Sequence, residues 1–119
     1  MTALLLVAHG SRRVSSNNEI RILAEKVREQ AGDRFDDVRC AFLELAEPSI
    51  PDGIEECIQA GATEVKVLPY FLSAGRHVVE DIPHEVEGKR AEHPEVRIEI
   101  VTYLGMAESM PDLLLSMAG

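Results

Sequence analysis

The stretch ALLLVA at residues 3–8 decides the fold, because six apolar residues follow one another without alternation. A strand with one face in water alternates apolar and polar residues, whereas a strand covered on both faces is apolar throughout. The run has no basic leader and is too short to span a bilayer, so we expect neither a signal peptide nor a membrane segment. It is predicted to be an interior strand of a cytoplasmic protein.

Three further strand-like runs follow along the chain. Residues 38–45 and 65–71 are mostly apolar, whereas VRIEIV at residues 96–101 alternates strictly and is typical of an edge strand. Pro69 lies inside the third run. Because proline cannot donate to a sheet ladder, we expect it near the C-terminal end of that strand.

Helical patterns separate the strands, and two kinds of signal mark where they begin. A serine followed three residues later by an acid has the capping-box spacing, and proline suits a first helical turn. The residues concerned are Ser16 with Glu19, Ser49 with Asp52, Pro83 and Pro111. The order βαβαβαβα predicts an α/β fold, namely a flavodoxin-like four-stranded parallel sheet with helices on both faces. The expected strand order is 2-1-3-4, with a ligand crevice between the first and third strands.

The length, net charge and cysteines of the chain limit the number of domains and the kinds of ligand that we expect. The chain has 119 residues, so a single domain over residues 1–119 is expected. A formal net charge of −9 argues against a nucleic-acid partner, and no P-loop is present to bind a nucleotide. Cys40 and Cys57 stand apart without a CxxC spacing, which favours reduced core thiols.

Polar residues follow three of the strands at the edge where a ligand is expected. His9 directly follows the first strand, Glu44 lies at the end of the second, and His77 follows the third. Gly10 and Gly75 are expected to allow tight turns beside the histidines and to let a ligand approach the backbone. The sequence therefore predicts that His9, Glu44 and His77 share one crevice.

Two imidazoles and a carboxylate suit divalent iron, cobalt, nickel or zinc better than magnesium or calcium. Three protein ligands leave coordination positions open, as catalysis or metal transfer requires. Alternatively, each histidine is an ordinary polar loop residue, and Glu44 caps the next helix or pairs with an arginine. Glu47 is a competing candidate for the role of Glu44 at the metal. The other two histidines, His84 and His93, are expected to be solvated, although His84 would share a helix face with His77 if that helix began early.

Basic residues lie next to both histidines. Arg12, Arg13 and Arg76 are either plain surface charges or a site for carboxylates or phosphates, which a guanidinium fork binds in bidentate fashion. Ser11 and the N-terminus of the first helix would add donors for the same anion.

Four motifs in this order carry a family resemblance: LLLVAHGSR at 4–12, LELAEPSI at 43–50, GATEVKVLPYFLSAGRHVVEDIP at 61–83 and LG at 104–105. Together they resemble the small class II tetrapyrrole chelatases of the CbiX/SirB type, which insert cobalt, nickel or iron into sirohydrochlorin. The resemblance covers nearly the whole chain. At the C-terminal end, however, LGMAESMPDLL lacks the histidine that many relatives have after LG.

The resemblance implies that His9 and His77 handle the metal, that Glu44 assists, and that the divalent metal is a substrate: Co²⁺, or alternatively Ni²⁺ or Fe²⁺. It implies sirohydrochlorin or a related anionic tetrapyrrole as partner, and a homodimer, because short members resemble half of a longer chelatase. The apolar tail MPDLLLSM is a candidate dimer surface and equally a candidate core segment.

Three other functions use the same features. A carrier protein would bind metal or tetrapyrrole in the crevice without turnover. A histidine phosphatase would need arginine directly before the first histidine, where this chain has Ala8. A receiver-type signalling module would need clustered acids after the first strand, where this chain has histidine and glycine.

Overall fold

The ALLLVA stretch forms the second strand across a four-stranded parallel sheet of order β2-β1-β3-β4 in the computed structural model, which describes residues 1–119. The strands are β1 (Thr2–Ala8), β2 (Asp37–Phe42), β3 (Glu64–Pro69) and β4 (Arg97–Ile100). The α/β class and the strand order are confirmed. Pro69 is the last residue of β3, opposite Val7, as its missing N–H predicts.

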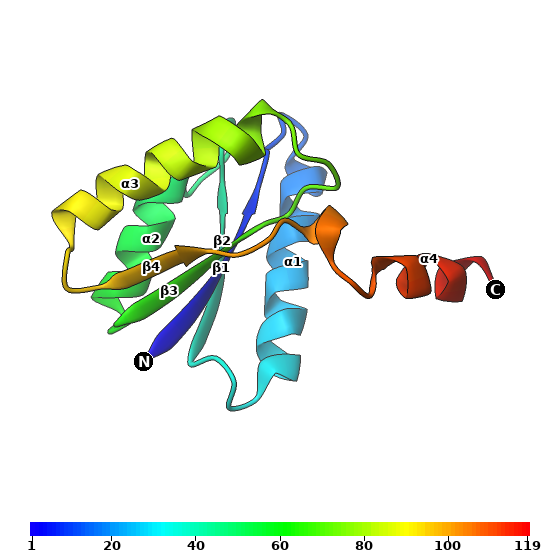
Figure 1. The fold of residues 1–119 in the computed structure, drawn as a ribbon, viewed down its shortest axis with the longest axis horizontal. Coiled ribbons are helices and arrows are strands. Elements are labelled where there is room, and N and C mark those ends of the chain that lie inside the picture. Colours follow the sequence, from blue (N-terminus) through cyan, green and yellow to red (C-terminus); the bar gives the residue numbers. More distant parts are fainter.

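Helices cover both faces of the sheet (Figure 1). The long α1 (Val14–Ala31) packs on one face, and α2 (Ile50–Gln59) and α3 (Ile82–Glu92) pack on the other. The chain also forms two short helical turns, a π-helical turn at His77–Asp81 and a 3₁₀ turn at Leu104–Met106.

The side chains of β1 alternate between two hydrophobic clusters. Leu5 and Val7 belong to the cluster beneath α2 and α3, while Leu4 and Leu6 belong to the cluster beneath α1. The unbroken apolar run therefore follows from coverage on both faces. Cys57 lies in the first cluster with no exposed surface, and its burial raises the pKa of the thiol to about 12.

Two of the predicted helix starts have different outcomes. Ser49 is the N-cap of α2, and its side chain accepts a hydrogen bond from Asp52 N at 3.2 Å, as predicted. The prediction for Ser16 is wrong, because α1 begins at Val14 after Arg13 as N-cap. No side chain caps the first turn of α1, and the Ser11 hydroxyl instead accepts from Arg13 N at 3.0 Å in the turn before the helix.

The fourth helix does not cover the sheet. Figure 1 shows α4 (Met110–Ala118) projecting away from the sheet and the other helices. Leu113, Leu114, Leu115 and Met117 are all at least half exposed, so the tail contributes nothing to the core of its own chain. No helix is both long enough and apolar enough to cross a membrane.

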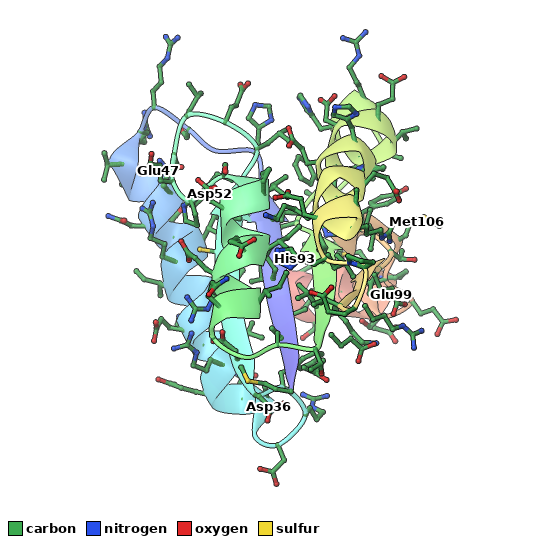
Figure 2. The ribbon with its side chains drawn as sticks, turned by 90° about the vertical axis from the view of Figure 1, so that its left-hand side faces the viewer. Asp36, Glu47, Asp52, His93, Glu99 and Met106 are labelled. Atoms are coloured by element: carbon green, nitrogen blue, oxygen red, sulfur yellow. The ribbon has the colours of Figure 1, made fainter.

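A polar cluster joins α2 to α3 and corrects the expectation that His93 is solvated. Glu55 Oε1 accepts hydrogen bonds from Lys89 Nζ at 2.7 Å and from His93 Nε2 at 2.8 Å. His93 lies between the two helices (Figure 2), and its bond to Glu55 raises its pKa. The ammonium of the buried Lys89 is the first cause that holds the pKa of Glu55 at about 2.

Candidate active site

The two histidines from the strand ends meet at the carboxyl edge of the sheet. His9 directly follows β1, and His77 is the first residue of the π-helical turn after β3. Their ring centroids are 4.6 Å apart, and the ring planes are nearly perpendicular at 87°. About 45% of the His9 side chain and 38% of the His77 side chain are exposed, so an ion from solvent can reach both imidazoles.

Glu44 joins this pair through His9. Its Oε1 lies 3.2 Å from His9 Nε2, and its backbone N–H donates to the His9 carbonyl oxygen at 3.0 Å. The strand β2 is shorter than predicted, so Glu44 lies in the following loop and not on the strand. The loops after β1 and β2 are therefore joined both by backbone and by side chains.

Gly10 is what lets these two loops touch. Its φ is +95°, and an added β-carbon would lie 1.7 Å from the carbonyl oxygen of Glu44. The predicted need for glycine here is correct. At Gly75 the chain does turn tightly, since Gly75 N donates to the Ser73 carbonyl oxygen at 3.2 Å. Its φ is not positive, however, and an added β-carbon would meet nothing within 4 Å, so this turn does not require glycine. Gly75 instead leaves open space two residues before His77.

Arg21 of α1 holds the loop that carries Glu44. Its Nη2 donates to the Glu47 carbonyl oxygen at 2.8 Å, and its guanidinium carbon lies 5.1 Å from the centroid of the Phe42 ring. Both contacts are made by one side chain, which links α1 to β2 and to the loop that follows it. Arg21 is engaged in structure and is not a free cation for a ligand.

Asp81 and Phe71 contact His77, and neither residue was predicted from the sequence. Asp81 Oδ2 lies 2.7 Å from His77 Nδ1, and the Phe71 ring centroid lies 6.4 Å from that of His77. The spacing of histidine and aspartate by four residues, just before proline, was a usable signal for the first contact. The aromatic contact depends on how the chain turns after β3, which no local pattern shows.

The predicted anion-binding arginines lie in the segments that carry the histidines, and their side chains are exposed. Arg12 and Arg13 are exposed, and the Arg76 side chain is 79% exposed with only Glu80 near it, at 3.7 Å. The backbone of Ser11 is clamped by the buried Asn17, which accepts from Ser11 N at 2.9 Å and donates to Ser11 O at 2.8 Å. Asn17 is thus a further positioning residue that the sequence did not reveal.

A hollow of about 450 Å³ opens beside His9, lined by the ends of β1 and β2, the start of α1 and residues 70–72. Exposed apolar side chains lie on the loops that carry or adjoin the site: Leu45, Leu72, Val79 and Met106. A second hollow, of about 460 Å³, is lined by acids of α2 and its preceding loop and contains neither histidine. Figure 2 shows Glu47 and Asp52 of this acidic hollow on the side opposite Met106.

As they stand, no three His, Cys, Asp or Glu side chains are arranged to hold a metal ion together. His9 contacts both Glu44 and His77, so the three predicted residues meet pairwise at His9. A joint His/Glu/His ligand set requires side-chain adjustment when an ion arrives. The half-exposed side chains leave room for that adjustment.

Comparison with known proteins identifies relatives of this chain. The sequence model of the CbiX family matches residues 3–118. A sirohydrochlorin cobaltochelatase of Methanococcus maripaludis is 45% identical over 83 residues, which are 70% of this chain and 56% of that protein. A sirohydrochlorin ferrochelatase of Priestia megaterium is 32% identical over 114 residues, 96% of this chain and 42% of that protein. The chain thus spans about half the length of these curated relatives.

Solved structures agree with the sequence matches. A cobalamin (vitamin B12) biosynthesis CbiX protein from Marinobacter aquaeolei VT8 superposes with a TM-score of 0.79 at 31% identity, covering 99% of this chain and 92% of that one. The sirohydrochlorin chelatase SirB of Bacillus subtilis subspecies spizizenii, solved with cobalt, superposes with a TM-score of 0.84 at 30% identity. The match covers 98% of this chain and 49% of SirB.

Proposed function

The chain belongs to the CbiX family, and we propose that it inserts a divalent metal ion into sirohydrochlorin or a related anionic tetrapyrrole. The observation that carries the proposal is the pair of half-exposed imidazoles of His9 and His77, 4.6 Å apart, with Glu44 in contact with His9. Relatives named as cobaltochelatases and ferrochelatases support Co²⁺ or Fe²⁺ as the metal. Co²⁺ is our first choice, with Ni²⁺ or Fe²⁺ as alternatives.

In this proposal His9, His77 and Glu44 bind the incoming ion. Neutral imidazole nitrogens and a carboxylate oxygen form a ligand set of borderline softness that suits these metals. An ion that is transferred to the substrate has to dissociate from its protein ligands. Because these side chains are partly exposed, water can replace them at the ion. The same accessibility opens coordination positions for the pyrrole nitrogens.

The peripheral carboxylates of the substrate bind Arg12, Arg13 and Arg76, with the hydroxyl of Ser11 as an additional donor. The charges of the three arginines are accessible, and the space beside Gly75 admits a flat ligand close to the backbone. These contacts place the macrocycle over the two histidines. The protein's overall negative charge does not exclude this, because three arginines are present in the segments that carry His9 and His77.

Insertion replaces two pyrrole protons by one divalent ion, so two protons must leave. The proposed general base is a histidine or Glu44, whichever the ion leaves unoccupied. The Glu44 carboxylate lies at hydrogen-bonding distance from His9, and both side chains open to solvent, to which the protons can pass. We propose that no nucleotide takes part, because the sequence has no P-loop to bind one. We place this reaction in the cytoplasm, where the two free thiols, Cys40 and Cys57, stay reduced.

Absorbance spectroscopy under anaerobic conditions tests this proposal. Sirohydrochlorin with Co²⁺ should convert faster in the presence of the protein than spontaneously, and His9→Ala and His77→Ala should each lower the catalysed rate at least about 100-fold, since loss of a ligand removes the interaction that positions the ion. The matched control is His84→Ala, an exposed histidine of α3 outside the site, which should keep the wild-type rate.

The outcomes separate the proposal from its main rival. Tight binding of Co²⁺ or pigment by the wild-type protein without acceleration by Co²⁺, Ni²⁺ or Fe²⁺ would establish a carrier and exclude the chelatase. Acceleration that survives loss of both histidines would refute the assigned site while keeping the activity.

We further propose that the protein works as a homodimer in which α4 contacts the second copy. The leucines of α4 are exposed, which is unfavourable in water, and burial against a second copy would remove this cost. Two copies of this chain would match the length of one SirB chain, of which it covers 49%. A second module would also enclose a macrocycle that one open crevice leaves exposed.

Light scattering over a concentration series checks the dimer. Wild-type protein should approach twice the chain mass of 13.1 kDa, whereas the double variant Leu114→Glu, Leu115→Glu should remain a monomer. Ser116→Glu adds charge to the same helix without removing a leucine, and should still pair. A wild-type mass of one chain at every concentration would contradict the dimer.

A further inference from the structure

We infer that Asp81 is a positioning residue for His77: its carboxylate fixes the Nδ1–H tautomer, so that the Nε2 lone pair of His77 is free for an incoming divalent ion. The inference rests on the proposed metal-handling role of His77. It assigns a function to a residue that lies outside the proposed ligand set.

The contact itself sets the tautomer. Asp81 Oδ2 and His77 Nδ1 are 2.7 Å apart, which is a short, strong hydrogen bond. An ionised carboxylate only accepts hydrogen bonds, and a neutral imidazole carries one N–H. The proton of neutral His77 is therefore on Nδ1, and Nε2 is the nitrogen with the free lone pair.

The two carboxylate–histidine contacts of the site are not equivalent. Glu44 contacts Nε2 of His9, whereas Asp81 contacts Nδ1 of His77. The two nitrogens point in divergent directions from an imidazole ring, so Asp81 supports His77 from the side away from its free nitrogen. A carboxylate in this position orients the ring and increases the basicity of the ligand nitrogen, as it does behind many metal-bound histidines.

The backbone around Asp81 holds it in place. Residues three or four apart share a helix face, and the π-helical turn His77–Asp81 places these two side chains together. Pro83 has no N–H to donate to the carbonyl of Val79, which disfavours regular α-helix here, and Ile82 N–H bonds the His77 carbonyl oxygen instead. Ile82 is fully buried, so the residue after Asp81 is anchored in the core.

Substitutions of Asp81 test this by two readouts on the full chain. ¹⁵N–¹H correlation spectra of the imidazoles, recorded above the histidine titration range, report the tautomer of His77, and Co²⁺ titration reports affinity. Asp81→Leu should shift His77 toward the Nε2–H form and weaken Co²⁺ binding about 10- to 100-fold. Asp81→Asn, which retains an acceptor oxygen, should keep the Nδ1–H form and most of the affinity. Glu85→Gln removes a carboxylate from the first turn of α3 and should change neither.

Each outcome decides the inference. Nδ1–H in Asp81→Leu would overturn it, and so would wild-type Co²⁺ affinity in a variant whose tautomer has changed. Circular dichroism of the variants separates unfolding from a local effect, and the retained fold of Asp81→Asn keeps the comparison valid. A wild-type protein that fails to accelerate chelation, while both effects of Asp81→Leu are present, would refute the proposed activity and leave the role of Asp81 standing.

Discussion

Replacing Gly10 with alanine is expected to lower the free energy of unfolding by roughly 2–4 kcal/mol and to separate Glu44 from His9. Two effects act together at this position. A φ of +95° costs an L-residue about 1–2 kcal/mol, and the new β-carbon would lie 1.7 Å from the Glu44 carbonyl oxygen, which forces one backbone away from the other. The hydrogen bond from Glu44 N to His9 O lies at that contact.

Urea unfolding followed by circular dichroism measures the loss, and two other glycines serve as controls. Gly32→Ala has a positive φ with no atom within 4 Å of the added β-carbon, so it should show only the conformational cost. Gly88→Ala, inside α3 with open space around it, should stabilise by about 0.5–1 kcal/mol. If Gly10→Ala costs no more than Gly32→Ala, the close contact between the two loops does not constrain the site.

Gly10 and Gly75 differ in a way that could not be predicted from the sequence. Both glycines stand next to or near a histidine in a loop, and the sequence treats them alike. Only Gly10 has to be a glycine, because its φ is positive and the loop after β2 leaves no room for a β-carbon. The local sequence shows where a glycine is, but it does not show which distant segment packs against that glycine.

The sheet, by contrast, follows from local patterns. Apolar runs long enough for strands, separated by helical periodicity, leave few topologies once right-handed crossovers are required. The predicted strand order brings His9, Glu44 and His77 to one edge of the sheet, and in the structure His9 contacts both of the others. The hydrophobic pattern therefore predicts which strands exist and their order, although β2 and β3 end earlier than the apolar runs do.

The contacts that position the site were harder to predict. The roles of Asn17 and Asp81 depend on turns whose conformation is set by tertiary contacts, namely the clamp on Ser11 and the π-helical turn before Pro83. The position of α4 also escaped prediction, because an apolar helix is compatible equally with a core and with a partner surface. In each case the sequence shows a suitable residue type without its partner.

Gly105→Ala is expected to have the other large effect, this time on the loop that leads to His77. The added β-carbon would lie 1.9 Å from the Leu72 carbonyl oxygen and 2.5 Å from its carbonyl carbon. Gly105 N also donates to the Phe71 carbonyl oxygen at 3.0 Å, so this glycine joins the 3₁₀ turn to the segment after β3. The φ of Gly105 is not positive, and the whole effect is therefore steric.

Because both sides of this contact are backbone, one segment must move, and the segment after β3 carries Phe71 beside His77. We expect a loss of roughly 1–3 kcal/mol in stability and a fall of at least about tenfold in metal insertion. Hydrogen exchange should show faster exchange in residues 70–76, while the β1–α1 loop around His9 keeps its protection. Unchanged exchange at 70–76 together with a wild-type insertion rate would show that the 3₁₀ turn moves away freely, and that the LG motif does not support the His77 loop.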